Sequence, residues 1–266
     1  MHSPVNWIGG KSKVAAEIIR RFPPHTCYVE PFAGGAHVFF AKQPSKVEVL
    51  NDLDQDLLNF YAVAQRRADY LARLLCLMPH SRVLFEDCLK NPPPVTPYNR
   101  VMRAARFWYL QQHCFAGRIL AQSFGYGTTR PLRKSPEAIK RAILAAATRL
   151  DLVTLESLPF ADVISRYDRP ETLFYCDPPY WKLDFYHHNF TGEQHAELAD
   201  VLRAISGMFI LSYNDVPEIR ALYDWADVDT VEVPYSAAAT ATKPHAAQPA
   251  QKPSFLVGGF FAGEPS

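Results

Sequence analysis

The stretch Leu173 to Trp181, LFYCDPPYW, brings together groups that could do chemistry. A hydrophobic run ends at Asp177, and two prolines and two aromatic residues follow it. Pro178 and Pro179 have no backbone N–H, so they cannot continue the hydrogen-bond ladder of a sheet. The stretch therefore predicts a buried strand that leads into a rigid turn. That turn would hold a carboxylate, two fixed carbonyl groups and the ring of Tyr180, which could stack on a planar base.

A second group of candidate residues lies in the segment VEPFAGGA, nearer the N-terminus. Ala33, Gly34 and Gly35 follow a short predicted strand, and small residues at such a place let a ligand approach the backbone. Asp52 ends the next predicted strand, about twenty residues further on, where an acid can bind ribose hydroxyl groups. Because the segment has no G-x-G-x-x-G pattern, it favours an adenosine-containing cofactor without a pyrophosphate over NAD.

Other patterns exclude several classes of protein. Gly10-Lys11-Ser12 matches the end of a P-loop, but Val5 stands where that motif requires its first glycine. The five cysteines are scattered without a C-x-x-C pair, so we expect reduced thiols in a cytoplasmic protein. No H-E-x-x-H motif is present, and no metal site is predicted. No apolar run reaches the roughly 18 residues of a membrane span, so a membrane is not expected as a partner.

Hydrophobic periodicity predicts strands that alternate with helices along most of the chain. Strands are expected within 25–35, 45–54, 151–157, 171–176, 207–215, 228–235 and 254–263, and helices within 36–43, 55–75, 98–113, 196–205 and from Ser135 onward. Residues 236–253 are rich in Ala, Thr and Pro and are expected to form a loop. Such alternation predicts an α/β fold with a doubly wound, mostly parallel sheet covered by helices on both faces.

A basic segment interrupts this alternation. Residues 90–150 contain eleven Lys and Arg residues and a single acid, Glu137, so the segment carries a net charge of +10 while the rest of the chain carries −9. Aromatic residues are interleaved with these charges, which is typical of a surface that binds a polyanion. We therefore expect a helical insert over 62–150 within a discontinuous domain formed by 1–61 and 151–266.

The segments NWIGGK, EPFAGG and DPPY together resemble, in type and in order, the motifs of the Dam-type (D12 class) DNA N6-adenine methyltransferases. The resemblance covers nearly the whole chain. It implies a Rossmann-like class I methyltransferase sheet with S-adenosylmethionine as cofactor and double-stranded DNA as substrate. The implied reaction is site-specific methyl transfer to N6 of a flipped-out adenine. We expect a monomer or a weak dimer.

The resemblance also implies a role for individual residues. Asp177, Pro178, Pro179 and Tyr180 would form the catalytic motif, and the cofactor would be bound by Trp7, Lys11, Phe32, Ala33, Gly34, Gly35, Asp52 and Asp177. Lys11 would lie near the cofactor's carboxylate and Asp52 would hold its ribose. Ser157 matches the family's motif on the adenine side of the cofactor.

The family's DNA-reading hairpin corresponds to residues 115–131, where Arg118 and Arg130 are candidates for groove contacts. This segment departs from the Asn-Val-Pro-Phe-Gly-like stretch of GATC-specific members and is more similar to the phage-borne branch. A motif other than GATC, or a looser one, is therefore expected.

Two alternatives stay open at this point. One is a methyltransferase for another planar amino group, namely cytosine N4, an RNA adenine or a glutamine amide. Glutamine and cytosine enzymes usually carry Asn or Ser where this chain has Asp177. The other alternative is a catalytically silent DNA-binding module, against which the intact Lys11, Asp52 and Asp177 argue.

Overall fold

The structure, a computed structural model, describes residues 1–7, 9–114, 122–129, 133–182, 190–229 and 255–256. Within them a six-stranded sheet has the order β3-β2-β1-β4-β5-β6, with β1 to β5 parallel and the short β6 antiparallel to β5. The strands are β1 (Cys27–Glu30), β2 (Val47–Asn51), β3 (Thr154–Glu156), β4 (Thr172–Cys176), β5 (Met208–Ser212) and β6 (Phe255–Leu256). This confirms the predicted α/β class with a doubly wound, mostly parallel sheet.

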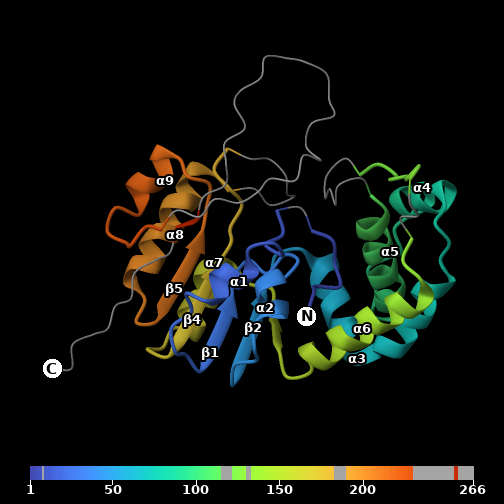
Figure 1. Cartoon of the computed structure of the whole chain (residues 1–266), viewed down its shortest axis with the longest axis horizontal. Helices are drawn as coiled ribbons and strands as arrows, with labels where there is room; N and C mark the ends of the chain where they lie inside the picture. The colour runs from blue at the N-terminus through green and yellow to red at the C-terminus, as the bar shows by residue number, and fades with distance from the viewer. Residues whose placement is uncertain (8, 115–121, 130–132, 183–189, 230–254, 257–266) are drawn as a thin grey trace, which may run out of the picture.

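Nine α-helices and one 3-10 turn connect the described strands (Figure 1). They are α1 (Ala15–Ile19), α2 (His37–Ala41), α3 (Gln55–Leu77), α4 (Arg82–Lys90), η1 (Pro97–Asn99), α5 (Arg100–His113), α6 (Pro136–Leu150), α7 (Phe160–Tyr167), α8 (Gly192–Ala204) and α9 (Pro217–Leu222). No helix in the described part of the chain is both long and apolar enough to cross a membrane.

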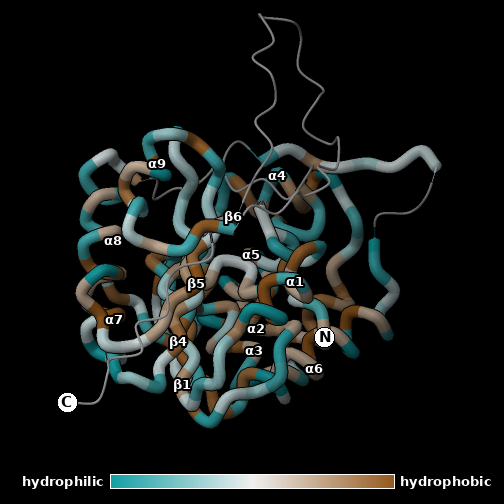
Figure 2. The backbone as a smooth tube through the Cα atoms, turned by 60° about the vertical axis from the view of Figure 1, so that its left-hand side comes forward, coloured by the Kyte–Doolittle hydropathy of each residue, from teal (hydrophilic) through white to brown (hydrophobic). Residues whose placement is uncertain are grey.

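Successive hydrophobic residues of β1, β2, β4 and β5 enter different cores, so β4 and β5 in the middle of the sheet are almost entirely hydrophobic (Figure 2). On β4, Leu173 and Tyr175 join the cluster under α1, α2 and α3. Phe174 and Cys176 join the opposite cluster, formed with α7, α8 and α9. Helices on both faces therefore bury both sides of the sheet, as expected of a doubly wound domain.

Local signals in the sequence explain where several helices begin. Asp54 caps α3 by accepting hydrogen bonds from the N–H groups of its first turn. Ser135 caps α6, with Pro136 at the first helical position. Thr191 and Gln194 form the predicted reciprocal capping box of α8.

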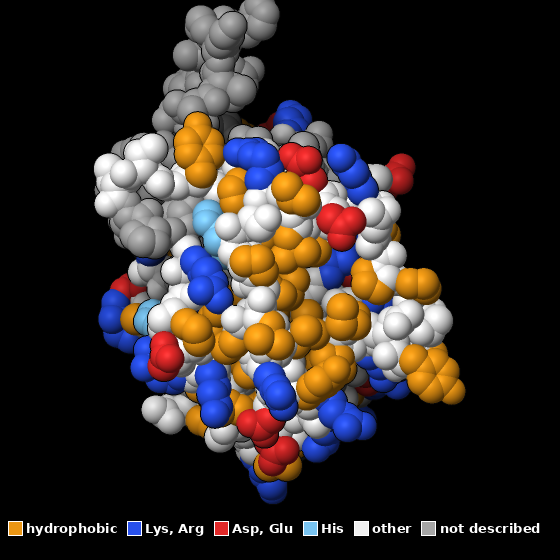
Figure 3. Space-filling model, turned by 90° about the vertical axis from the view of Figure 1, so that its right-hand side faces the viewer, with side chains coloured by type: hydrophobic (Ala, Val, Ile, Leu, Met, Phe, Trp, Pro, Cys, Tyr) orange, Lys and Arg blue, Asp and Glu red, His pale blue; other side chains and the backbone are white. Residues whose placement is uncertain are grey.

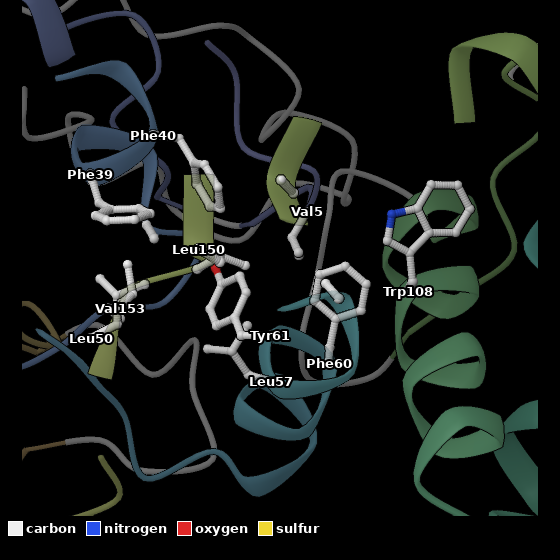
Figure 4. Packing of buried hydrophobic residues seen from close by; sticks show 14 of the residues in the cluster. Val5, Phe39, Phe40, Leu50, Leu57, Phe60, Tyr61, Trp108, Leu150 and Val153 are labelled. Carbon is white, nitrogen blue, oxygen red and sulfur yellow. The ribbon is translucent and has the colours of Figure 1, made fainter. Parts of the chain in front are cut away.

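Helices α3 to α6 form a lobe beside the sheet (Figure 1), here called the α3–α6 lobe (residues 55–113 and 133–150). Helix α3 packs against both α5 and α6. Its residues continue past Tyr61 without a break, apart from non-helical dihedral angles at Arg67. One hydrophobic cluster joins Leu50 of the sheet, Phe60 of α3 and Trp108 of α5 (Figure 4). The core is therefore continuous across residue 61, and the division into a catalytic domain and a 62–150 insert stays a prediction.

Most predicted elements are found within two or three residues of their expected bounds. The predicted strand at 228–235 and loop at 236–253 lie outside the described residues, apart from Val228 and Asp229, which are not in a strand. Four short helices, α1, α4, α7 and α9, were not predicted. Their five to nine residues contain too few turns for a periodic pattern to identify them.

Candidate active site

A cavity of about 210 Å³ opens at the carboxyl edge of the sheet. It lies where the strand order reverses, because β1 is followed in sequence by β2 on one side but has β4 on its other side. The loops after β1 and β4 diverge at such a switch point, and open α/β sheets bind ligands there. The cavity is lined by residues from five segments: the N-terminal turn, the loop after β1, the loop after β2, the start of α7, and the region from β4 to α8.

The N-terminal turn and the loop after β1 are interlocked. Trp7 packs against Gly34 and Gly35 so closely that a Cβ atom on either glycine would lie 2.7 Å from the Trp7 side chain. Gly34 also has a positive φ of 46°, which side chains other than glycine rarely adopt. The small residues of this loop are therefore required by a close approach within the protein, and Trp7 and the loop line the cavity together.

Asp52 follows β2 and holds this loop in place. Its Oδ2 accepts a hydrogen bond of 2.8 Å from the Gly34 N–H, and its Oδ1 accepts one of 2.9 Å from the Asp54 N–H. Tyr61 donates to the Gly34 carbonyl from the other side, at 2.7 Å. Asp52 and Asp54 both line the cavity. Asp52 thus orders the glycine loop and presents a carboxylate to any ligand beside it.

An aromatic triangle lines the cavity next to this loop. The rings of Phe32, Phe160 and Phe190 lie with their centroids 5.4 to 5.6 Å apart, in tilted or edge-to-face arrangements. Phe160 begins α7, and Phe190 shortly precedes α8. Such a surface suits a planar heterocycle. Ser157 accepts a hydrogen bond from Gln55 and is not among the described residues that line the cavity, whereas the neighbouring Leu158 and Pro159 are.

Asp177 lies directly after β4, and side chains from two other segments hold its carboxylate. The Ser212 hydroxyl, at the end of β5, donates to Oδ1 at 2.7 Å. The Lys11 ammonium group donates to Oδ2 at 2.6 Å and to the Gly9 carbonyl at 3.0 Å. Ser212 and Lys11 are buried, whereas the Asp177 side chain is 21% exposed. The carboxylate is therefore fixed in orientation and borders the cavity.

The residues after Asp177 form a supported turn. Pro179 lines the cavity and Pro178 is buried. Tyr180 is half-buried rather than exposed, with its ring 4.9 Å from the Lys11 nitrogen. Asn214 pairs with the backbone of Trp181 on both sides, accepting from its N–H and donating to its carbonyl. Asn214 thereby positions the turn that carries Pro179 and Tyr180.

Glu30 and His37 also line the cavity. Burial raises the pKa of Glu30 to about 8, although its hydrogen bonds from Tyr28 and the Phe39 N–H favour the ionised form. Burial and the nearby Lys11 lower the pKa of His37 to about 4, so its imidazole is neutral at physiological pH. Within the described residues, no group of three or more His, Cys, Asp or Glu side chains could hold a metal ion.

Four basic residues of the α3–α6 lobe are engaged inside the protein, whereas others, such as Lys90, Arg100, Lys140 and Arg141, are exposed. Arg103 and Arg106 pair with Asp56 of α3, Arg133 donates to the Cys76 carbonyl, and Arg149 forms a buried ion pair with Glu48 of β2. One face of the lobe carries many hydrophobic side chains, with Lys and Arg scattered among them (Figure 3). The charge of the segment therefore overstates the positive surface. Arg118 and Arg130 lie outside the described residues.

The structure brings most of the expected site residues to one cavity. Trp7, Lys11, Phe32, Ala33, Gly34, Gly35, Asp52, Asp177 and Pro179 all line it. Sequence reasoning missed Phe160, Phe190, Ser212 and Asn214. Ser212 ends a strand that was predicted, so its place at the carboxyl edge was available as a signal. No pattern in the sequence singles out the two phenylalanines.

Comparison with known proteins gives a family match over most of the chain. The pattern of the family described as D12 class N6 adenine-specific DNA methyltransferase matches residues 7–236. A protein of Escherichia phage P1 named DNA N-6-adenine-methyltransferase is 30% identical over 244 residues, which cover 82% of this chain and 30% of that protein. The DNA adenine methylase of Escherichia coli K12 is 28% identical over 249 residues, which cover 86% of each chain. The Retron Ec67 DNA adenine methylase of Escherichia coli is 28% identical, with 84% of this chain and 81% of that protein covered.

Proposed function

The chain belongs to the D12 class of N6 adenine-specific DNA methyltransferases, and from this premise we propose that it transfers a methyl group from S-adenosylmethionine to adenine N6 in double-stranded DNA, with Asp177 as the central catalytic residue. The observation that carries this proposal is the Asp177 carboxylate, which is held between Ser212 and Lys11 at the rim of the cavity. A monomer or a weak dimer is part of this proposal.

Adenine N6 is a weak nucleophile because its lone pair is delocalised into the ring. In this proposal Asp177 and the rigid turn after it increase its nucleophilicity. The Asp177 carboxylate and the Pro178 carbonyl accept the two amino hydrogens, which favours a pyramidal nitrogen with a localised lone pair. Once the methyl group has been transferred, the remaining hydrogens on N6 become acidic and the carboxylate takes one of them. Because Pro178, Pro179 and the Asn214 contact fix the acceptors beforehand, little reorganisation is needed in the transition state.

The residues that line the cavity fit S-adenosylmethionine in their chemistry. The cofactor supplies an electrophilic methyl group on its sulfonium. The triangle of Phe32, Phe160 and Phe190 suits its adenine ring, and the carboxylates of Asp52 and Asp54 can accept hydrogen bonds from ribose hydroxyls. The small residues of the loop after β1 allow its backbone to approach the ligand, and the Trp7 side chain of the N-terminal turn packs against Gly34 and Gly35 of this loop.

The DNA must present its target base outside the helix, because N6 is inaccessible in a stacked duplex. In this proposal Tyr180 stacks on the flipped base, next to the carboxylate that receives the amino group. The 115–131 segment, with Arg118 and Arg130, supplies the groove contacts in this proposal. All five cysteines are free thiols, in keeping with a reducing compartment such as the cytoplasm.

Identification of the methylated base tests the proposal. Purified protein, labelled S-adenosylmethionine and unmethylated genomic DNA are incubated together, and the nucleosides are then separated by mass spectrometry. We expect N6-methyladenine, and sequencing of the same DNA locates the motif. Label found only in N4-methylcytosine, or only in RNA supplied in a parallel reaction, would replace this function with that of a related amino methyltransferase. Cofactor binding without any transfer would indicate a silent DNA-binding module.

A further inference from the structure

The Lys11 side chain contacts two residues of the turn after β4, Asp177 and Tyr180. Its nitrogen lies 2.6 Å from Asp177 Oδ2 and 4.9 Å from the centre of the Tyr180 ring. The side chain is only 10% exposed. Lys11 comes from the N-terminal turn, 166 residues away from Asp177 in the sequence. Neither spacing nor charge pattern predicts this contact, and the resemblance assigns Lys11 to the cofactor's carboxylate instead.

These two contacts coincide with those that the proposed reaction assigns to the target adenine. In that reaction an amino hydrogen of adenine is donated to Asp177, and the base stacks on Tyr180. Here the Lys11 ammonium group donates to Asp177 and lies over the Tyr180 ring. Asp177 Oδ1 is already hydrogen-bonded to Ser212, which is 1% exposed. Lys11 and the amino group of a flipped base therefore compete for Oδ2.

The geometry points to Lys11 as a specificity-determining residue: its ammonium group occupies the position of the target amino group at Asp177. It must therefore be displaced before a base can enter. This inference rests on the proposed function. In the free enzyme the Lys11 ammonium group compensates the charge of a half-buried carboxylate. A base that enters must separate this charge-assisted pair. The 6-amino group of adenine then donates a hydrogen bond to Asp177 in place of Lys11. A base that carries a carbonyl or a C–H in place of this amino group cannot donate one.

Lys11 can make this exchange without a change of fold. Its backbone carbonyl is anchored by the N–H groups of Val14 and Ala15 at 3.0 and 2.8 Å, so the turn stays in place. Its side chain has four rotatable bonds and swings independently. The cofactor's carboxylate offers an alternative anionic partner, which reconciles the role implied by the resemblance with the observed ion pair.

The test uses duplexes that contain the motif located by sequencing, with 2-aminopurine in place of the target adenine. This base lacks the 6-amino group, and its fluorescence rises when it leaves the stack. In wild-type protein Lys11 opposes its entry. Lys11→Met removes the ammonium group but keeps the length and apolar volume of the stem. We expect the ratio of flipped to stacked base to rise about 10-fold or more, which corresponds to loss of a charge-assisted competitor.

Two further variants make the test decisive. Lys11→Gln, which is also uncharged, should give the same rise, and Lys13→Met, at an exposed lysine two residues on, should give none. Fluorescence that is unchanged or lower in both Lys11 variants at saturating protein would overturn the inference. Methyl transfer to the unmodified duplex by the wild-type protein is measured in parallel. Absence of that transfer would count against the proposed function itself, so the two failures are distinguishable.

Discussion

The carboxyl edge of the sheet and the α3–α6 lobe use charged residues in opposite ways. At the sheet edge, Lys11, Asp52 and Asp177 come from three distant segments and meet at one cavity. In the lobe, Arg103, Arg106 and Arg149 turn inward and pair with acids of neighbouring helices and strands. The ends of parallel strands are brought together by topology, so motif order predicts a site. Net charge along helices does not distinguish internal ion pairs from a binding surface.

The largest effect of a substitution on stability is expected where the α3–α6 lobe joins the sheet. Glu48 pairs with Lys42 and Arg149, and all three side chains are less than 10% exposed. Glu48→Gln leaves two buried cations without a counter-charge, so we expect the free energy of unfolding to fall by about 3–5 kcal/mol in urea titrations. Asp151→Asn, which disrupts the exposed pair with Arg66, should change it by less than about 1 kcal/mol. Similar values for the two variants would contradict an inward role for Arg149.

Asp52 tests whether the sheet edge binds the cofactor. Asp52→Asn keeps an acceptor for only one of the two N–H groups that Asp52 holds, and it removes the charge that strengthens hydrogen bonds from ribose hydroxyls. We expect the affinity for S-adenosylmethionine, measured by calorimetry, to fall about 10- to 100-fold. Asp162→Asn alters an exposed carboxylate on α7 and serves as the control. An affinity within error of wild type would reject the ribose assignment.

Glu30 predicts a pH dependence of stability. Its folded pKa of about 8 exceeds the value of about 4.5 expected when the chain is unfolded. Between these values the folded protein keeps a proton that the unfolded chain has released, so stability falls as pH rises through this window. Glu30→Gln removes this dependence. From pH 5 to pH 8 we expect wild type to lose more than about 1 kcal/mol relative to the variant. Parallel melting curves over this range would show that Glu30 titrates normally.

The smallest effect concerns the DNA contacts of the basic segment. If Arg118 binds a phosphate, Arg118→Ala should weaken all sites together and lower the slope of log affinity against log salt by about 0.9. If it reads a guanine, the methylated motif should relax at one position. Arg166→Ala, at an exposed arginine of α7, is the control. Unchanged slope and motif in Arg118→Ala would remove this residue from the DNA interface.

The sequence predicted the sheet, the long helices and most of the cavity because hydrophobic periodicity and helix caps act locally. Asp54, Ser135 and Thr191 are examples, since each caps the helix that follows it in the chain. The pairing of Lys11 with Asp177 depends on how the N-terminal turn folds over the sheet, which no local pattern encodes. The Phe190 ring enters the site for the same kind of reason, through packing against Phe32 and Phe160.

The inward pairing of these arginines also explains why the net charge of residues 90–150 overestimates the positive charge on the surface of the lobe. Arg103, Arg106 and Arg149 lie on helices whose other faces form the core, and long arginine side chains reach acids on adjacent elements. Those acids, Asp56 and Glu48, lie outside the 90–150 window, so a count within the window leaves them out.

The central claim is that the Asp177 carboxylate, which Ser212 and Lys11 hold in the free protein, receives the amino group of the target adenine. Single-turnover transfer of labelled methyl groups, started from a preformed complex with cofactor and DNA, tests this claim most directly in Asp177→Asn. We expect the rate of transfer at saturating cofactor to fall about 100-fold or more, while the melting temperature stays close to that of wild type. Transfer at a rate within about threefold of wild type, in a variant that is folded and binds cofactor, would contradict the account.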